Sequence, residues 1–440
     1  MTNQELVDQT ARAYLYGFPL VADLDQVHRY VTAGVGSTPA APFNTLAHTR
    51  TLAGPAETFV SINNDTVYTQ AQLDLSVGPV TLHVPDTAGR YYVMQFVDAW
   101  TDNFAYVGKR ATGTDAGDFL LVPPGWTGSA PDGVTVIEFP TRIASIVGRW
   151  ACSGVDDLPA VHALQDATTL TPQDPAAKPA GLPTPDPKTD PDLLFLEKLR
   201  IWSQAFPPAP RDHALQDSYK GLGIDQPGPS PYTQPDAALS AGIEAGKKKL
   251  EYLLTHTAGA PVNGWQVNLH IFDYNLDYFQ VGTIDSPQYK ITDPEQRIAD
   301  RAIAARAGLW GNNAYEAAYF PVYVDDQGQR LDGANTYTLR LDPTPPVGAF
   351  WSLTMYSVPD FYLVDNPIDR YSLGDRTPGI VYADDGSLTI TISHTAPTDP
   401  TARANWLPSP AGEFRPLMRM NQPEAAVLDL SYVLPPIIKS

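Results

Sequence analysis

The sequence predicts a mainly β protein with added helices: an N-terminal β-sandwich, a helical middle region and a C-terminal jelly-roll-like β-sandwich. Three observations predict this class. The chain of 440 residues is longer than one hydrophobic core normally supports, so two or three domains are expected. Its 43 Pro and 32 Gly favour turns and short strands. Strand-like patterns also occupy two separate stretches, with helical periodicity before and between them.

The first element is expected to be an amphipathic helix over residues 3–16. Thr2-Asn-Gln-Glu5 matches a capping box, in which the side chains at both ends satisfy free backbone N–H groups. Apolar residues then recur at helical spacing. Gly17 and Pro19 are expected to interrupt this helix, with a second segment possible as far as Tyr30.

Strands are predicted from about Thr58 to Arg149. Residues 80–84 alternate between apolar and polar side chains, and residues 91–97 are rich in aromatic and β-branched side chains. Turn residues follow each run at intervals of about ten residues, as in sandwich domains. This stretch therefore predicts the N-terminal β-sandwich.

The middle of the chain combines a Pro-rich segment with helices. Residues 171–210 contain ten prolines, and the first half of this segment has the composition of an extended linker. Asp190-Pro191 then has the pattern of a helix start. A further helix is predicted over 235–256, and a second capping box, Thr292-Asp-Pro-Glu295, opens one that stops at Gly308.

Strand patterns return after Gly311, over residues 335–341, 347–356 and 386–392. They predict the second β unit. The expected regions are a helical segment at 1–57, a sandwich at 58–152, a Pro-rich and helical region at 153–310 and a jelly-roll-like domain at 311–440.

One internal similarity connects the two β units. Gly89–Asp98 aligns with Gly348–Ser357, and each has two aromatic residues at the third and fourth positions. A single local match only suggests a duplication.

The charge and the cysteine content limit the partners and the compartment. The net charge of −20 repels phosphate backbones and anionic lipids, so neither nucleic acid nor membrane is an expected partner. The single Cys152 permits no disulfide within the chain, and a buried apolar role is more common for it than a nucleophilic one. With no secretory pattern at the start and no long apolar run, cytoplasmic residence is expected.

Standard catalytic and cofactor motifs are absent from the sequence. It contains no Gly-x-Ser-x-Gly elbow and no phosphate-binding Walker loop. The eight His are scattered, and none stands at metal-ligand spacing from another His or from the Cys. We therefore predict no cofactor and no metal, although a metal site assembled from distant residues stays open.

Three groups of polar residues stand near the ends of predicted strands. Carboxylate, tyrosine and arginine together suit acid–base chemistry with anion stabilisation, and they suit ligand binding equally well. For each single residue, stabilising a turn or holding a loop in place is a more common role than catalysis or ligand binding. The groups are Asn63, Asn64, Asp65, Thr66 and Tyr68; Asp98, Asp102, Asn103 and Tyr106; and Tyr356, Asn366, Arg370, Tyr371, Asn405 and Trp406, with Arg142 and Arg149 nearby.

Three hypotheses for function follow from these groups. The first is a metal-independent hydrolase or lyase acting on a small organic substrate, with Asp65 or Asp98 as the acid–base group and Tyr68 or Tyr92 assisting. The second is a non-catalytic protein that binds a carbohydrate or small metabolite, and the third is an assembly role. Substrate-binding candidates are Asn63, Asn64, Arg149, Tyr356, Arg370 and Trp406.

The same residues also resemble two known families. Three N-terminal stretches resemble the DUF1254 family: Asn63–Tyr68, Val84–Asp98 and Asn103–Gly108. Pro345–Tyr356, Asn366-Pro367, Arg370–Ser372, Asp385–Ser387 and Asn405–Pro408 resemble the DUF1214 family.

The resemblance implies a β-sandwich, a helical middle and a jelly-roll-like domain, and it makes a homo-oligomer plausible. The function of this family is unsettled, so it supplies no catalytic residues. Relatives often carry Arg where this chain has Asn64, which puts a shared ligand in doubt. Many relatives also look exported, whereas no signal is expected here.

Overall fold

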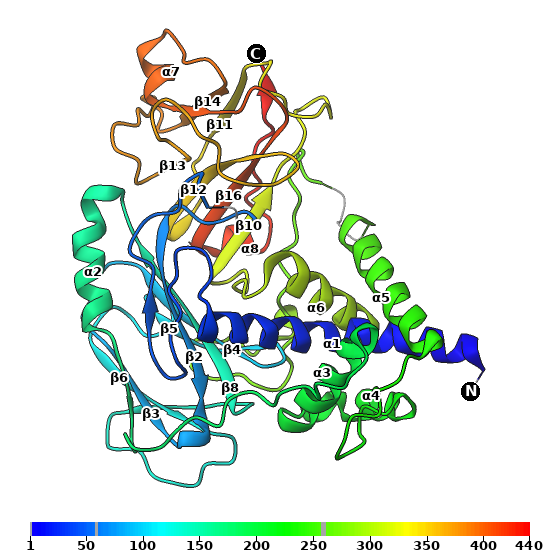
Figure 1. Cartoon of the computed structure of the whole chain (residues 1–440). Coiled ribbons are helices and arrows are strands. Elements are labelled where there is room, and N and C mark those ends of the chain that lie inside the picture. Colours follow the sequence, from blue (N-terminus) through cyan, green and yellow to red (C-terminus); the bar gives the residue numbers. More distant parts are fainter. Residues whose placement is uncertain (1, 58–59, 257–260) are drawn as a thin grey trace.

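The computed structural model describes residues 2–57, 60–256 and 261–440. Figure 1 shows three groups of elements: N-terminal sheets, helices beside them, and C-terminal sheets at the opposite end from α4. The mixed architecture, with two β units and a helical middle, confirms the predicted fold class. The expected start of the strands at Thr58 lies outside the described residues.

The N-terminal unit is a sandwich of two sheets. The five-stranded sheet has the antiparallel order β1-β2-β8-β4-β5, and the four-stranded sheet has the order β7-β6-β3-β9. One hydrophobic core lies between them, with Phe96 and Ile146 from the first sheet and Leu82 and Leu121 from the second. The strands are β1 (Ala47–His48), β2 (Thr66–Asp74), β3 (Val80–Val84), β4 (Tyr92–Asp98), β5 (Asn103–Gly108), β6 (Gly117–Val122), β7 (Thr135–Glu138), β8 (Ile143–Ala151) and β9 (Thr169–Pro172).

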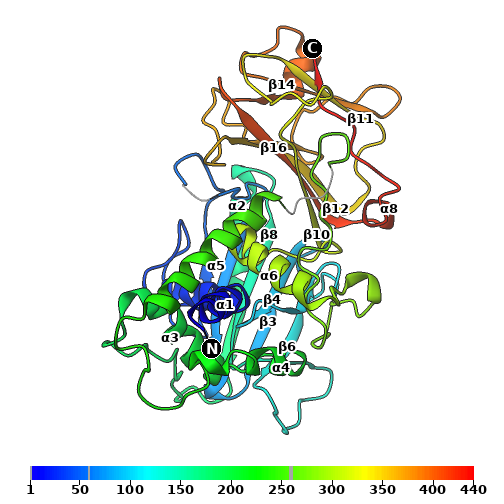
Figure 2. The ribbon, with the colours of Figure 1, turned by 90° about the vertical axis from the view of Figure 1, so that its right-hand side faces the viewer.

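Helices cover the outer face of the five-stranded sheet. Val97 and Val147 of that sheet share a core with Leu20 of α1 and with Leu199 of α3. Figure 2 shows α1 nearly end-on, with α5 and α3 beside it. The helices are α1 (Asn3–Thr32), α2 (Leu158–Ala167), α3 (Leu194–Ala205), α4 (His213–Asp217), α5 (Ala237–His256) and α6 (Pro294–Gly308).

Helix α1 is longer than the sequence predicts. The Thr2–Glu5 capping box is present, with both of its hydrogen bonds. The predicted interruption is wrong, because α1 continues through Gly17 and Pro19 as one helix of 30 residues. A Cβ atom at Gly17 would lie 2.6 Å from Leu199, so this glycine serves close packing against α3 rather than a break.

The second capping box also differs from its prediction. Asp293, not Thr292, caps α6, and its side chain accepts a hydrogen bond from the Gln296 N–H at 2.7 Å. Pro294 occupies the first helical position, which makes the preceding residue the cap. The predicted stop at Gly308 is confirmed.

The C-terminal unit contains two further sheets, in the orders β10-β16-β12-β13 and β15-β14-β11-β17. Leu353 and Met418 of the first sheet share a core with Leu339 and Ile390 of the second. The finer jelly-roll description stays a prediction. The elements are β10 (Ala317–Pro321), β11 (Tyr337–Leu341), β12 (Val347–Ser357), β13 (Ser372–Gly374), β14 (Leu388–Ser393), α7 (Pro400–Ala404), β15 (Trp406–Pro408), β16 (Phe414–Pro423), α8 (Ala425–Leu428) and β17 (Ile438–Lys439).

A helix needs about 20 mostly apolar residues to span a bilayer. Among the described helices, none combines the length and the apolar character needed to cross a membrane.

Candidate functional site at the domain interface

The first predicted polar group lies where the two β units meet. Asp65 directly precedes β2 and is only 6% exposed. Its carboxylate accepts hydrogen bonds from the hydroxyls of Ser352 on β12 and Ser372 on β13, the latter at 3.1 Å. Its backbone carbonyl also accepts one from Arg376 Nη2 at 3.1 Å. The acid–base candidate is therefore held by the C-terminal domain.

The two asparagines before Asp65 shape the entry into β2. Asn63 Oδ1 accepts a hydrogen bond from the Asp65 N–H at 2.6 Å, which is the pattern of an Asx turn. Asn64 donates to the Ala53 carbonyl and accepts from Ser372 Oγ at 3.3 Å. In this structure both side chains position Asp65.

Three buried arginines converge on this interface: Arg149 on β8, and Arg415 and Arg419 on β16. Within the described part of the chain, none of the three forms an ion pair. Burying a guanidinium without a carboxylate is costly, because the charge loses its hydration. Asp65 is the nearby carboxylate whose charge acts on Arg419, so what these cations lack is a direct ion pair.

Neutral oxygen atoms stabilise two of these cations. Arg149 donates to Gln95 Oε1 at 2.8 Å and to the Trp310 carbonyl at 2.9 Å. Arg419 donates to the Ser61 carbonyl at 2.7 Å and to Thr354 Oγ1 at 3.0 Å. These bonds fix both guanidinium groups without neutralising them.

Tyrosine rings complete the cluster. The guanidinium carbon of Arg149 lies 5.6 Å from the centre of the Tyr68 ring. Tyr356 has Arg415 at 5.2 Å and Arg419 at 5.6 Å from its ring centre. Burial raises the pKa of the Tyr356 hydroxyl, which donates to the Ile62 carbonyl at 2.6 Å. Both tyrosines are therefore held beside cations.

Several buried polar atoms near these residues have no partner among the described residues. They include Thr66 Oγ1 at the start of β2, and Arg415 Nε and Asn421 Nδ2 on β16. Buried polar groups are normally satisfied by the protein, by water or by a ligand. The unsatisfied atoms thus lie on β2 and on β16, and β16 also carries two of the three cations.

We call the following residues the interface cluster: Asp65, Tyr68, Arg149, Ser352, Tyr356, Ser372, Arg415 and Arg419. It unites four of the residues predicted from sequence. Sequence reasoning missed the two serines and the two arginines of β16. The signal for the arginines was present, because two charged residues four positions apart interrupt an otherwise apolar strand pattern.

The second predicted polar group lies elsewhere, between the five-stranded sheet and the helices. Asp98 Oδ1 accepts hydrogen bonds from the N–H groups of Trp100 at 2.9 Å and Asp102 at 2.8 Å. Burial, together with the charge of Asp102, raises the Asp98 pKa to about 7. Asp102 forms ion pairs of 2.9 Å with Arg211 and Arg301. The Asp98 side chain thus stabilises a turn by hydrogen bonding to its backbone N–H groups.

The remaining predicted residues are also apart from the interface cluster. Tyr92 is buried in the sandwich core and stacks on Trp150 with ring centres 5.1 Å apart. Arg370 donates to the carbonyls of Ala404 and Trp406 at 2.9 Å, which ties a C-terminal loop. The Trp406 indole is buried and donates to the Ser393 carbonyl at 2.9 Å.

Across residues 2–57, 60–256 and 261–440, no three His, Cys, Asp or Glu side chains converge in a way that would hold a metal ion.

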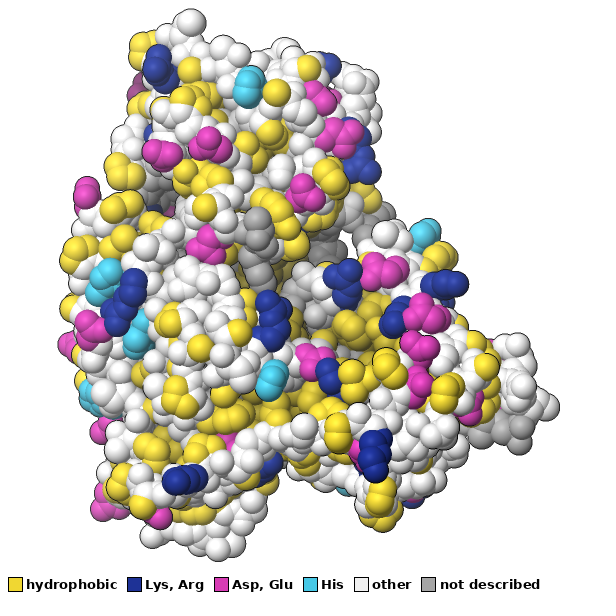
Figure 3. Space-filling view, in the orientation of Figure 1, with side chains coloured by type: hydrophobic (Ala, Val, Ile, Leu, Met, Phe, Trp, Pro, Cys, Tyr) yellow, Lys and Arg dark blue, Asp and Glu magenta, His cyan; other side chains and the backbone are white. Residues whose placement is uncertain are grey.

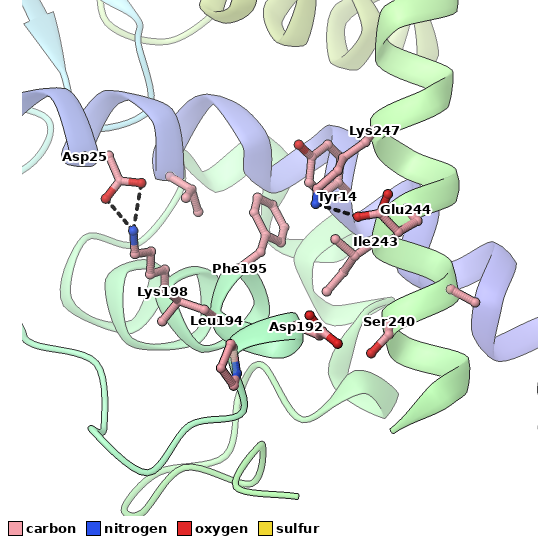
Figure 4. Close-up of a pocket in the computed structure, with 13 residues that line it drawn as sticks. Tyr14, Asp25, Asp192, Leu194, Phe195, Lys198, Ser240, Ile243, Glu244 and Lys247 are labelled. Carbon is pink, nitrogen blue, oxygen red and sulfur yellow. Dashed lines mark hydrogen bonds and ion pairs between the residues drawn. The ribbon is translucent and has the colours of Figure 1, made fainter. Parts of the chain in front are cut away.

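Within the described part of the chain, some hollows lie outside the interface cluster, and two of them are large. One is a groove of about 740 Å³ along another part of the domain interface. The other, of about 520 Å³, lies between α1, α3 and α5. Figure 4 shows Phe195 and Ile243 in this second pocket, with two charged pairs around them. These pairs are Asp25–Lys198 and Glu244–Lys247, each at 2.6 Å, so most of its charges neutralise one another. In Figure 3, apolar surface lies among charged side chains over this region.

These features define a two-domain protein whose β units enclose a polar, cation-rich interface. Comparison with known families agrees with that class. Residues 43–172 match the family described as a protein of unknown function, DUF1254, and residues 316–425 match the corresponding family DUF1214. The chain belongs to the two-domain DUF1254/DUF1214 family.

A solved structure with the same fold exists. The VPA0106 protein from Vibrio parahaemolyticus is 24% identical over 100% of both chains, with a TM-score of 0.73. A putative uncharacterized protein from Burkholderia cenocepacia is 11% identical, with a TM-score of 0.46 over 100% of this chain and 94% of that one. No curated protein matches the sequence. The first likeness establishes a shared fold.

Proposed function

We propose that this protein is a metal-independent enzyme of hydrolase or lyase type, which acts on a small organic anion at the interface cluster. One observation carries the proposal. Three buried arginines without an ion pair in the described chain lie beside Tyr68 and Tyr356, and the charge of Asp65 acts on one of them, Arg419. In a chain of net charge −20, such cations are retained at a cost, and a bound anion offsets that cost.

The residues divide into two roles in this proposal. Arg149 and Arg419 hold the anionic group, because guanidinium N–H groups match carboxylate and phosphate oxygens. Asp65 acts as the acid–base group, with Tyr68 as a second proton donor. Ser352 and Ser372 orient the carboxylate from the other domain. Bond cleavage then requires both domains.

A second candidate is a non-catalytic binding protein. Both carboxylate oxygens of Asp65 already accept a serine hydroxyl, and the Tyr356 hydroxyl is bound to a carbonyl. Groups whose hydrogen-bonding capacity is engaged are less available for proton transfer. This observation favours binding of a small metabolite without turnover.

A ligand screen followed by matched variants tests the proposal. The purified full chain is screened by thermal shift against small carboxylates, phosphate esters and sugars, since a ligand of the folded state raises the melting temperature. We expect an organic anion as the hit. Arg419→Gln should weaken its binding about tenfold or more, because a charge-assisted hydrogen bond contributes about 1.5–3 kcal/mol.

Arg403 supplies the matched control. It is exposed and forms no ion pair in the described chain, so Arg403→Gln should leave affinity unchanged. For an enzyme, Asp65→Asn should lower turnover of the hit at least a hundredfold while binding persists. Binding without any turnover in the unmodified protein would establish the second candidate. A neutral sugar as the sole hit, unaffected by Arg419→Gln, would overturn the anion proposal.

A further inference from the structure

The groove of about 740 Å³ brings together residues from both domains. It lies along the domain interface, and no member of the interface cluster lines it. The N-terminal domain contributes the turn before β4, Lys109 after β5 and the segment after β8, whereas the C-terminal domain contributes Phe350 of β12 and Arg376 after β13. The groove therefore has a lining of its own, although Arg376 connects it to the interface cluster by donating to the Asp65 carbonyl.

The charges along this groove are unequally neutralised. Arg90 forms a two-pronged ion pair with Asp157, at 2.6 and 2.7 Å. Neither Lys109 nor Arg376 has an ion pair within the residues that the structure describes. The remaining carboxylate in the lining, Asp156, is exposed. Three cations and two carboxylates line the groove, which leaves one positive charge in a chain of net charge −20.

Arg376 is held in place with most of its donors free. Its guanidinium carbon lies 3.5 Å from the centre of the Phe350 ring, a close cation–π contact. Its Nη2 donates to the Asp65 carbonyl at 3.1 Å. Burial lowers the pKa of Arg376, while the carboxylates of Asp65 and Asp375 act in the opposite sense. A guanidinium carries five N–H donors, so several remain for a ligand.

Aromatic rings from both domains form a firm apolar wall. Tyr91 and Phe350 meet edge to face, with ring centres 5.5 Å apart. They occupy equivalent positions in the internal similarity between Gly89–Asp98 and Gly348–Ser357. The Tyr91 hydroxyl donates to Glu316 at 2.8 Å, which fixes that ring. Both rings are almost fully buried, at 4% and 1% exposure, so they form a rigid base beneath Arg376.

We propose that this groove is a second anion-binding site, which takes a small organic anion with a carboxylate or phosphate group and bridges the two domains through Lys109 and Arg376. The volume suits such a ligand, because small-molecule sites commonly measure about 300–1,000 Å³. The bound anion would contact one cation from each domain and so hold the domains together. This site does not depend on the function proposed for the interface cluster.

Calorimetric titration of the full chain with inorganic phosphate and, separately, with benzoate tests the proposal. Lys109→Gln and Arg376→Gln should each weaken binding about tenfold or more, or abolish it. The side chain of Lys109 makes no hydrogen bond in the described chain, so Lys109→Gln should keep the fold and its melting temperature. The exposed control variants Lys178→Gln and Arg403→Gln should bind as the unmodified protein does.

The two probes separate the ligand classes. Binding of phosphate alone supports a phosphate ester, and binding of benzoate alone supports an aromatic carboxylate. Two results overturn the proposal: neither probe binds, or Lys109→Gln binds with unchanged affinity.

Arg419→Gln distinguishes this groove from the interface cluster. Because Arg419 belongs to the interface cluster, any binding that Arg419→Gln alone loses is assigned to that cluster. The groove proposal requires a phosphate or benzoate binding event that Arg419→Gln keeps and Lys109→Gln loses. An equal loss in Arg419→Gln and Lys109→Gln would mean one shared site and would refute a separate one. Conversely, suppose that Arg419→Gln no longer binds the ligand found in the thermal-shift screen and still binds phosphate or benzoate in the groove. That result would support both sites independently.

Discussion

The buried carboxyl of Asp98 makes a sharp prediction about stability and pH. Its folded pKa is raised to about 7, from an ordinary value of 3.8, chiefly by burial. Below pH 4 the group is protonated in both states, so it costs nothing. As the pH rises toward 7, the unfolded chain releases this proton first, and folding becomes less favourable. The difference of about three pH units, at about 1.36 kcal/mol each, amounts to about 4 kcal/mol.

Asp98→Asn should remove this penalty and keep the turn. The Asn oxygen can still accept from the N–H groups of Trp100 and Asp102, so the hydrogen bonds of the loop persist. We expect the variant to be more stable than the unmodified protein at pH 8, by up to about 4 kcal/mol, with a smaller gain at pH 5. Urea unfolding at both pH values measures the difference, in which the titrating groups far from Asp98 cancel.

Asp98→Ala is the matched control for the turn. It removes the same charge but leaves two buried N–H groups unsatisfied, at a cost of about 1–3 kcal/mol each. It should therefore be less stable than Asp98→Asn at every pH. A gain for Asp98→Asn that is the same at pH 5 and pH 8, or that falls with pH, would refute the reasoning.

Two further predictions concern packing and a buried hydrogen bond. In Gly246→Ala, the new Cβ on α5 would lie 2.6 Å from Tyr14 of α1, so we expect a loss of about 1–3 kcal/mol in urea unfolding. Gly412→Ala, with nothing within 4 Å, should be nearly neutral, and equal losses in both would contradict the packing argument. Trp310→Phe removes the indole that donates to the buried Asp23 carboxylate at 2.6 Å, at a cost of about 2 kcal/mol. Unchanged unfolding of Trp310→Phe would show that this bond contributes little.

Local signals in the sequence predicted the elements well. The strand patterns over 80–84 and 335–341 correspond to β3 and β11, and the Thr2–Glu5 box does cap α1. The predicted break at Gly17 and Pro19 failed because tertiary packing overrode local propensity. Leu199 of α3 packs against Gly17. The residues around Gly17 in the sequence do not show this contact, so its stabilising energy could not be predicted from them.

Only part of the candidate site could be predicted from the sequence. Asp65 and Tyr68 are neighbours in the chain, so their grouping was apparent. Ser352 and Arg419 come close to them only through the fold, across more than 280 positions. No local pattern encodes a contact of that range. The sequence could not separate a turn-capping role of Asp98 from a catalytic one, because both kinds of aspartate occur in the same sequence context.

The division of the interface cluster between two domains has a consequence for how the family varies. A substitution at Asp65 changes its hydrogen bonds with the serines on β12 and β13. A substitution at Arg419 changes its hydrogen bond with the Ser61 carbonyl. Neither half can be exchanged for a distant counterpart without disturbing these contacts. The two domains are therefore constrained to change together, as the partners in a permanent complex do. A chimera that joins domains from distant relatives should lose the contacts of the interface while each domain keeps its hydrophobic core.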